Sequence, residues 1–206
     1  MRILIIGESI RSLAYILTLQ NTDKSLTLDM ISDKTEVGLS DELQPGCLVA
    51  DHPILPVLRH HIPENTKNST FLRHSWVLRS MAIQAINQGL NLHLRSAEKT
   101  IENGASIFEG KASESFRGPI QFDLKYKSDG AEIGNVWHGS VNLIRNSDSF
   151  CFDRGDGTFE HWTSKKDEGD GNLQTGRWIG VDPRFGLKSA IESGIHDAHV
   201  LLKSLK

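Results

Sequence analysis

A chain of 206 residues with 38% hydrophobic and 24% charged residues has the composition of an ordinary globular protein, which excludes extended disorder. Its formal net charge of −3 excludes the basic surface typical of nucleic-acid binding, and no apolar run approaches the roughly 20 residues that a membrane-spanning helix needs. We therefore expect a cytoplasmic protein that acts on a small molecule, without nucleic-acid or membrane partners.

The first 33 residues predict a strand, a helix and a second strand. Residues 2–6 form a continuous apolar run, which is typical of a fully buried strand. Residues 10–20 carry apolar side chains at helical spacing, and residues 26–31 read as the next strand. Two strands joined by a helix in this way pair in parallel through a right-handed crossover. The sequence therefore predicts an α/β fold.

The middle of the chain reads as one long helix followed by short strands. Residues 34–70 hold four of the six prolines and are expected to be irregular, whereas residues 71–88 form a helical pattern that ends at Gly89. Further strands are predicted at residues 90–94, 105–108, 120–126, 134–137, 141–144 and 150–152. A polar loop at 163–176, a buried strand at 177–181 and a helix at 187–205 complete the pattern.

The two cysteines and the histidines carry no chemistry that the sequence can assign. Cys47 and Cys151 lie far apart, and we expect both to be reduced thiols. His60 and His61 are adjacent, but no carboxylate or cysteine stands at a compact ligand spacing from them. We therefore predict no metal site.

The turn after the first strand is similar to the G-x-G-x-x-G motif of dinucleotide-binding folds with two glycines replaced. Gly7 keeps the first glycine, which makes the tight turn, while Ser9 and Ser12 stand where glycines allow a close approach of the pyrophosphate and of the helix. The hydroxyl of Ser9 can donate a hydrogen bond, and Ser12 is small enough for close packing. Glu8 adds an unfavourable negative charge that Arg11 could offset.

An acid at the end of the second strand would bind the ribose hydroxyls of an adenosine. Asp33 lies 21 residues after Ser12, which suits this role, and Ser32 is the other candidate for the position. An aspartate there is equally typical of a turn.

Five segments resemble, in the same order, the flavin-dependent halogenases and related monooxygenases. They are Val37–Glu42 with Pro45-Gly46, Leu72–Trp76, Phe122–Ala131 (compare "fDlvvgADGa"), Trp178–Pro183 (compare "vlliGD") and Ala190–Gly194 (compare "Ai.SG..aA"). The resemblance implies an FAD/NAD(P)-binding Rossmann-like fold with a reduced second β-rich subdomain, and FAD as the cofactor. It implies a single domain over residues 1–206 with a β-rich insertion over 100–176.

The same resemblance implies which residues contact the cofactor. Arg73 would lie near it, Asp129 and Gly130 would form a turn near the dinucleotide, and Asp182 after Gly180 would bind the flavin ribityl chain. The resemblance assigns no catalytic residue.

This chain also departs from the family pattern. Val181 separates the glycine and the acid of the closing motif, and about 50 residues separate Asp129 from Gly180, where these enzymes usually insert a substrate-binding sheet. Two functions stay open. One is a small FAD-dependent oxidoreductase; the other is a degenerate, non-catalytic protein of the same fold that acts as a ligand-binding or partner subunit, in a homo- or hetero-oligomer.

Overall fold

The computed structural model describes residues 1–38, 43–46, 72–102, 104–128, 134–145, 150–165 and 171–205. These residues belong to two compact units. The first unit comprises Met1–Leu39, Met81–Asp129 and Ile191–Lys206, and the second comprises Ser40–Ser80 and Gly130–Ala190.

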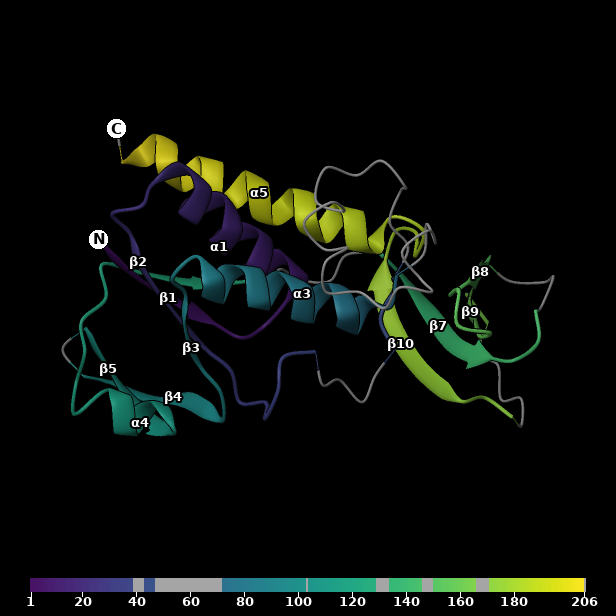
Figure 1. Ribbon diagram of the computed structural model, residues 1–206, viewed down its shortest axis with the longest axis horizontal. Coiled ribbons are helices and arrows are strands. Elements are labelled where there is room, and N and C mark those ends of the chain that lie inside the picture. The colour runs from purple at the N-terminus through teal and green to yellow at the C-terminus, as the bar shows by residue number, and fades with distance from the viewer. Residues whose placement is uncertain are drawn as a thin grey trace. The chain divides into compact units, whose positions relative to one another are not determined.

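A four-stranded sheet is the centre of the first unit, with the strand order β3-β2-β1-β6 (Figure 1). Its strands are β1 (Arg2–Ile6), β2 (Thr27–Ile31), β3 (Asn91–His93) and β6 (Leu124–Lys127). β1 pairs in parallel with both β2 and β6, and β2 pairs in parallel with β3. The predicted parallel crossover and the α/β class are confirmed.

Three long helices accompany this sheet: α1 (Ile10–Thr22), α3 (His74–Asn87) and α5 (Gly186–Ser204). The side-chain amide of Gln20 on α1 donates to the carbonyl oxygen of Ala85 on α3 at 3.0 Å. Gly89, with a φ of +100°, follows α3 as the sequence predicts. Within the described part of the chain, no helix is long and apolar enough to cross a membrane.

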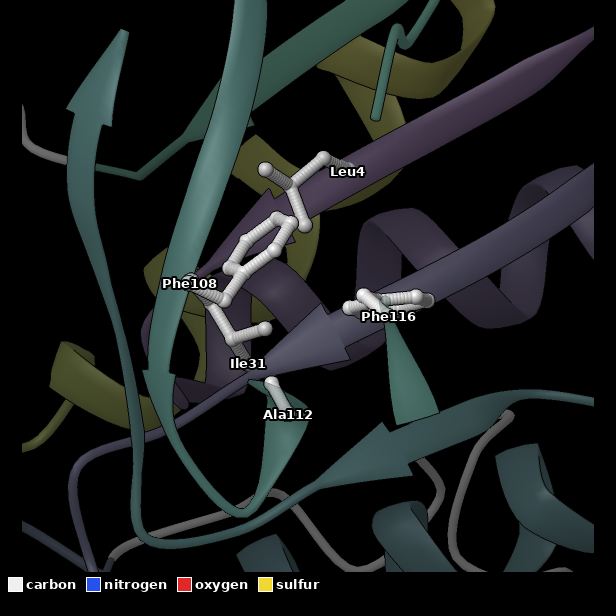
Figure 2. Packing of buried hydrophobic residues seen from close by; sticks show 5 residues of the cluster. All are labelled: Leu4, Ile31, Phe108, Ala112 and Phe116. Atoms are coloured by element: carbon white, nitrogen blue, oxygen red, sulfur yellow. The ribbon is translucent and has the colours of Figure 1, made fainter. Parts of the chain in front are cut away.

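The opposite face of the parallel sheet is covered by the hairpin of β4 (Ser96–Glu102) and β5 (Ala105–Gly110) and by the short helix α4 (Ala112–Ser115). Figure 2 shows the apolar cluster that joins these layers, which consists of Leu4, Ile31, Phe108, Ala112 and Phe116. β4 and α4 are missing from the sequence prediction, because their segments are largely polar and carry no clear apolar period.

The second unit contains an antiparallel sheet in the order β10-β7-β9-β8. Its strands are β7 (Asn135–Asn142), β8 (Phe150–Asp153), β9 (Phe159–Thr163) and β10 (Gln174–Gly180). Aromatic side chains gather around the buried Trp162, namely Trp137, Phe150, Phe152 and Trp178.

Two strand predictions in this unit are wrong. The segments 134–137 and 141–144 belong to one strand, β7, because Gly139 is no turn. A Cβ atom on Gly139 would lie 2.6 Å from the ring of Trp162, so this glycine leaves room for the indole on the neighbouring strand. The last strand, predicted as fully buried at 177–181, is β10. Its burial alternates because it belongs to the antiparallel sheet.

A stacked tyrosine pair joins α1 to β6 in the first unit. The rings of Tyr15 and Tyr126 lie parallel, with their centroids 3.9 Å apart. The hydroxyl of Tyr126 donates to the carboxylate of Asp197 on α5 at 2.6 Å. Within the described part of the chain, the buried hydroxyl of Tyr15 has no hydrogen-bond partner.

We expect the two hydroxyls to have opposite effects on stability. Tyr126→Phe removes a hydrogen bond to a charged group and should lower the free energy of unfolding by about 1.5 kcal/mol. Tyr15→Phe removes a buried, unpartnered polar group and should leave the free energy unchanged or raise it by up to about 1 kcal/mol. Urea unfolding of both variants measures the difference, and equal destabilisation by both would contradict the assigned hydrogen bonding.

Candidate functional site

The turn between β1 and α1 has the conformation expected of the first glycine of a dinucleotide motif. Gly7 has a φ of +83°, and its amide donates to the carbonyl oxygen of Ile31 at the end of β2 at 2.9 Å. A Cβ atom on Gly7 would meet no other atom within 4 Å. The turn therefore requires glycine for its backbone conformation, and open space lies beside it.

Three serine hydroxyls meet where α1 begins. Ser9 caps the helix: its Oγ accepts from the backbone amide of Ser12 at 3.0 Å and donates to the hydroxyl of Ser12 at 3.0 Å. Ser128, directly after β6, lies 2.9 Å from the same Ser9 oxygen. The cap uses one of the amides that a phosphate would otherwise meet at a helix N-terminus.

Arg11 lies in the first turn of α1 but is turned towards α5. Its Nε donates to the carboxylate of Asp197 at 2.8 Å, and this hydrogen bond raises the pKa of Arg11. No ion pair joins Arg11 to Glu8, although both lie in the described part of the chain. The expected compensation of Glu8 by Arg11 is therefore wrong, because Asp197 is the carboxylate that Arg11 binds.

Glu8 reaches the end of β2. One oxygen of its carboxylate accepts from the hydroxyl of Ser32 at 2.9 Å, and the other accepts from the amide of Gly38 at 3.2 Å. Partial burial raises the pKa of Glu8, against the opposing effect of the Ser32 hydrogen bond. Asp33 follows Ser32 and is exposed.

Arg73 precedes α3 in the second unit and forms an ion pair with Asp156. The Nε atom of Arg73 lies 2.9 Å from the Asp156 carboxylate, and the guanidinium lies over the ring of Trp76, 4.6 Å from its centroid. The Arg73 side chain is thus held by its ion pair with Asp156 and by the face of the Trp76 ring.

Gly180 ends β10, and Asp182 follows it before α5. The backbone amide of Arg184 donates to Asp182 at 2.8 Å, and the Arg184 guanidinium binds the same carboxylate, which lowers the pKa of Asp182. The indole of Trp178 lies against Gly180 and against Gly186, the first residue of α5. A Cβ atom added to Gly180 would lie 2.2 Å from the indole, and one added to Gly186 would lie 3.0 Å from it.

A buried ion pair in the second unit has no signal in the sequence. Glu160 on β9 is fully buried, and one of its oxygens accepts from the Trp162 indole at 2.7 Å and from the amide of Gly46 at 3.3 Å. The other oxygen lies 3.9 Å from the Nε of Arg154, and neither of these two atoms has a hydrogen-bond partner among the residues that the structure describes. Burial raises the pKa of Glu160 to about 7.

Three residues that the sequence singles out, Asp129, Gly130 and Cys47, lie outside the described residues. Cys151 is a free cysteine, and its sulfur lies 4.0 Å from the imidazole of His161. A search of the described residues finds no group of three His, Cys, Asp or Glu side chains placed to hold a metal ion.

Comparison with solved structures identifies an α/β, Rossmann-like fold. Glycine oxidase from Bacillus cereus has a TM-score of 0.62 and 10% identity, with 98% of this chain and 95% of that chain covered. The halogenase PltM has a TM-score of 0.60 and 9% identity over 99% of this chain and 69% of that chain. CabE, an aromatic hydroxylase from angucycline biosynthesis, has a TM-score of 0.54 and 9% identity.

The alignment with CabE covers 98% of this chain but only 62% of CabE. No family model matches the sequence, and no curated protein matches it either. The structural likeness, at identities near 10%, shows the fold alone, which is an α/β, Rossmann-like fold.

The residues at the start of α1 fit the pyrophosphate of a dinucleotide. Among the described residues, nothing lies within 4 Å of a Cβ atom placed on Gly7, which leaves space for a ligand against the backbone at the positive end of α1. The hydroxyls of Ser9 and Ser128 already donate within the serine cluster, because Ser9 donates to Ser12 and Ser128 donates to Ser9, and Ser12 is buried.

Proposed function

We propose that this chain binds FAD and is an oxidoreductase that acts on a small molecule. The observation that supports this most strongly is the β1–Gly7–α1–β2 crossover, with its positive-φ glycine and open turn at the carboxyl ends of parallel strands. Ligands of doubly wound α/β folds bind at such ends. When bound, the flavin would supply the redox chemistry, while the chain supplies binding and orientation.

The proposal assigns the pyrophosphate to the turn at Gly7 and to the start of α1, at Ser9 and Ser12. The proposal assigns the adenosine ribose to one of two carboxylates near the end of β2, that of Glu8 or that of Asp33. We also carry forward, as proposed cofactor contacts, Arg11 from the turn motif and, from the family resemblance, Arg73, Asp129, Gly130, Gly180 and Asp182.

A second candidate function is a non-catalytic protein of this fold that binds another ligand or a partner subunit. Two observations favour it. The side chain of Ser9 caps α1 where a glycine would leave the helix end bare, and the indole of Trp178 covers the glycines at the start of α5. The first feature places a side chain where a three-glycine motif would leave the backbone exposed.

Substitution of Ser9 separates the two functions. We expect the wild-type chain to bind FAD, and Ser9→Gly to bind it equally or more tightly, because the glycine restores the close approach of the backbone and costs only a few tenths of a kcal/mol of capping energy. Ser9→Ala, the matched control, keeps the Cβ atom and loses the hydroxyl, so it should bind more weakly than Ser9→Gly.

The measurement is a titration of each variant with FAD, followed by flavin fluorescence and by calorimetry. Failure of both the wild type and Ser9→Gly to bind FAD would contradict the oxidoreductase function and favour the non-catalytic one. Binding by Ser9→Gly alone would show a site that Ser9 has closed.

A further inference from the structure

The end of β2 lacks an acid of its own. β2 ends at Ile31, and the next residue is Ser32, which is buried and cannot supply a negative charge. Asp33, one position later, is exposed. A dinucleotide fold needs a carboxylate at this place, because it accepts the hydrogen bonds of the ribose hydroxyls.

Glu8 brings a carboxylate to this place from the other loop. Its two oxygens are held by the hydroxyl of Ser32 at 2.9 Å and by the amide of Gly38 at 3.2 Å. Ser32 is itself held, because its amide donates to the carbonyl oxygen of His93 at 3.0 Å and its hydroxyl accepts from the amide of Lys34 at 3.1 Å. The position of the Glu8 carboxylate is therefore determined by three backbone segments.

The Glu8 carboxylate also keeps acceptor capacity for a ligand. Two oxygens offer about four lone-pair sites, and the donors from Ser32 and Gly38 use two of them. The residue is only partly buried. A pair of neighbouring hydroxyls on a sugar is a donor set that suits the two remaining sites.

We propose that Glu8 is the residue that binds the 2′ and 3′ hydroxyls of the adenosine ribose, in place of an acid at the end of β2. The inference rests on the proposed function, because it needs a ligand with an adenosine half. The turn motif alone marks the negative charge of Glu8 as unfavourable near a phosphate, whereas this assignment gives Glu8 a role in ligand specificity. A carboxylate at the 2′ position would also reject a ligand with a 2′-phosphate, since two negative charges would meet there.

The first test compares FAD binding by the full chain and by two variants. Glu8→Gln keeps the size of the side chain and removes its charge, and it should weaken FAD binding about 10- to 100-fold, as expected for lost hydrogen bonds to a charged group. Asp33→Asn, the competing assignment, should change the affinity less than twofold. Circular dichroism and thermal unfolding check that both variants fold.

The second test varies the ligand and so does not depend on how a variant folds. ADP and 2′-deoxy-ADP are compared as competitors of FAD on the wild-type chain, and ADP should bind about tenfold more tightly. This preference should disappear in Glu8→Gln.

The outcomes distinguish the two proposals. FAD binding that is unchanged in Glu8→Gln, or weakened by Asp33→Asn instead, would overturn the role of Glu8 and leave the proposed function standing. The same holds if the wild type binds ADP and 2′-deoxy-ADP equally. Absence of any FAD binding by the wild type would overturn both.

Discussion

Replacing Gly194 by valine is expected to lower the free energy of unfolding by about 3 kcal/mol, because α1 and α5 touch at this glycine. A Cβ atom on Gly194 would lie 2.2 Å from the carbonyl oxygen of Arg11 and 2.9 Å from the Cβ atom of Ala14. A local shift of the Arg11 carbonyl alone would break a hydrogen bond within α1. The larger side chain must therefore separate the two helices.

Urea unfolding measures this effect, and a substitution on the same helix controls for it. His199 is exposed on α5, so His199→Ala should change the free energy of unfolding by less than about 0.5 kcal/mol. If Gly194→Val unfolds at the same urea concentration as the wild type, the close packing of α1 on α5 is contradicted.

Because of Glu160, the free energy of unfolding should fall as the pH rises. Burial raises the pKa of Glu160 from 4.5 to about 7 in the folded protein. Between these two values the folded chain holds a proton that the unfolded chain has lost, so stability falls as the pH rises. At 1.36 kcal/mol for each pH unit, the loss between pH 4.5 and pH 7 is roughly 3 kcal/mol.

Glu160→Gln removes this titration, and the difference between variant and wild type isolates it. Relative to the wild type, Glu160→Gln should gain roughly 3 kcal/mol of unfolding free energy between pH 4.5 and pH 8. Urea unfolding at the two pH values measures the gain. Glu109→Gln, an exposed control, should show none. A constant difference between Glu160→Gln and the wild type across this range would show that Glu160 is ionised in the folded protein.

The parts of the fold that the sequence predicts are those with strong local periodicity. β1, α1, β2, α3 and α5 have continuous apolar runs or clear helical stripes, and their bounds agree with the prediction within a few residues. In β9, Glu160 and His161 stand side by side and both are buried. Two adjacent polar residues are typical of an exposed segment, so the sequence does not predict this strand. β7 contains a glycine that serves a neighbouring tryptophan, which only the paired strands reveal.

The candidate site shows the same division between local and distant contacts. The turn at Gly7 and the capping capacity of Ser9 follow from residue type and spacing. The partners that decide the chemistry lie far along the chain: Ser32 is 24 residues from Glu8, and Asp197 is 186 residues from Arg11. No local pattern predicts such contacts, so the sequence alone assigns the ribose to Asp33 or Ser32 and gives Glu8 an unfavourable role.

The central claim, that this fold still binds its cofactor, is tested most directly by the visible absorption spectrum of the purified, untagged chain. The spectrum is recorded as purified, then again after incubation with FAD and removal of the excess by gel filtration. The account predicts a flavin band that is retained with the protein after filtration. A colourless protein that releases all added FAD would contradict flavin binding and with it the oxidoreductase function.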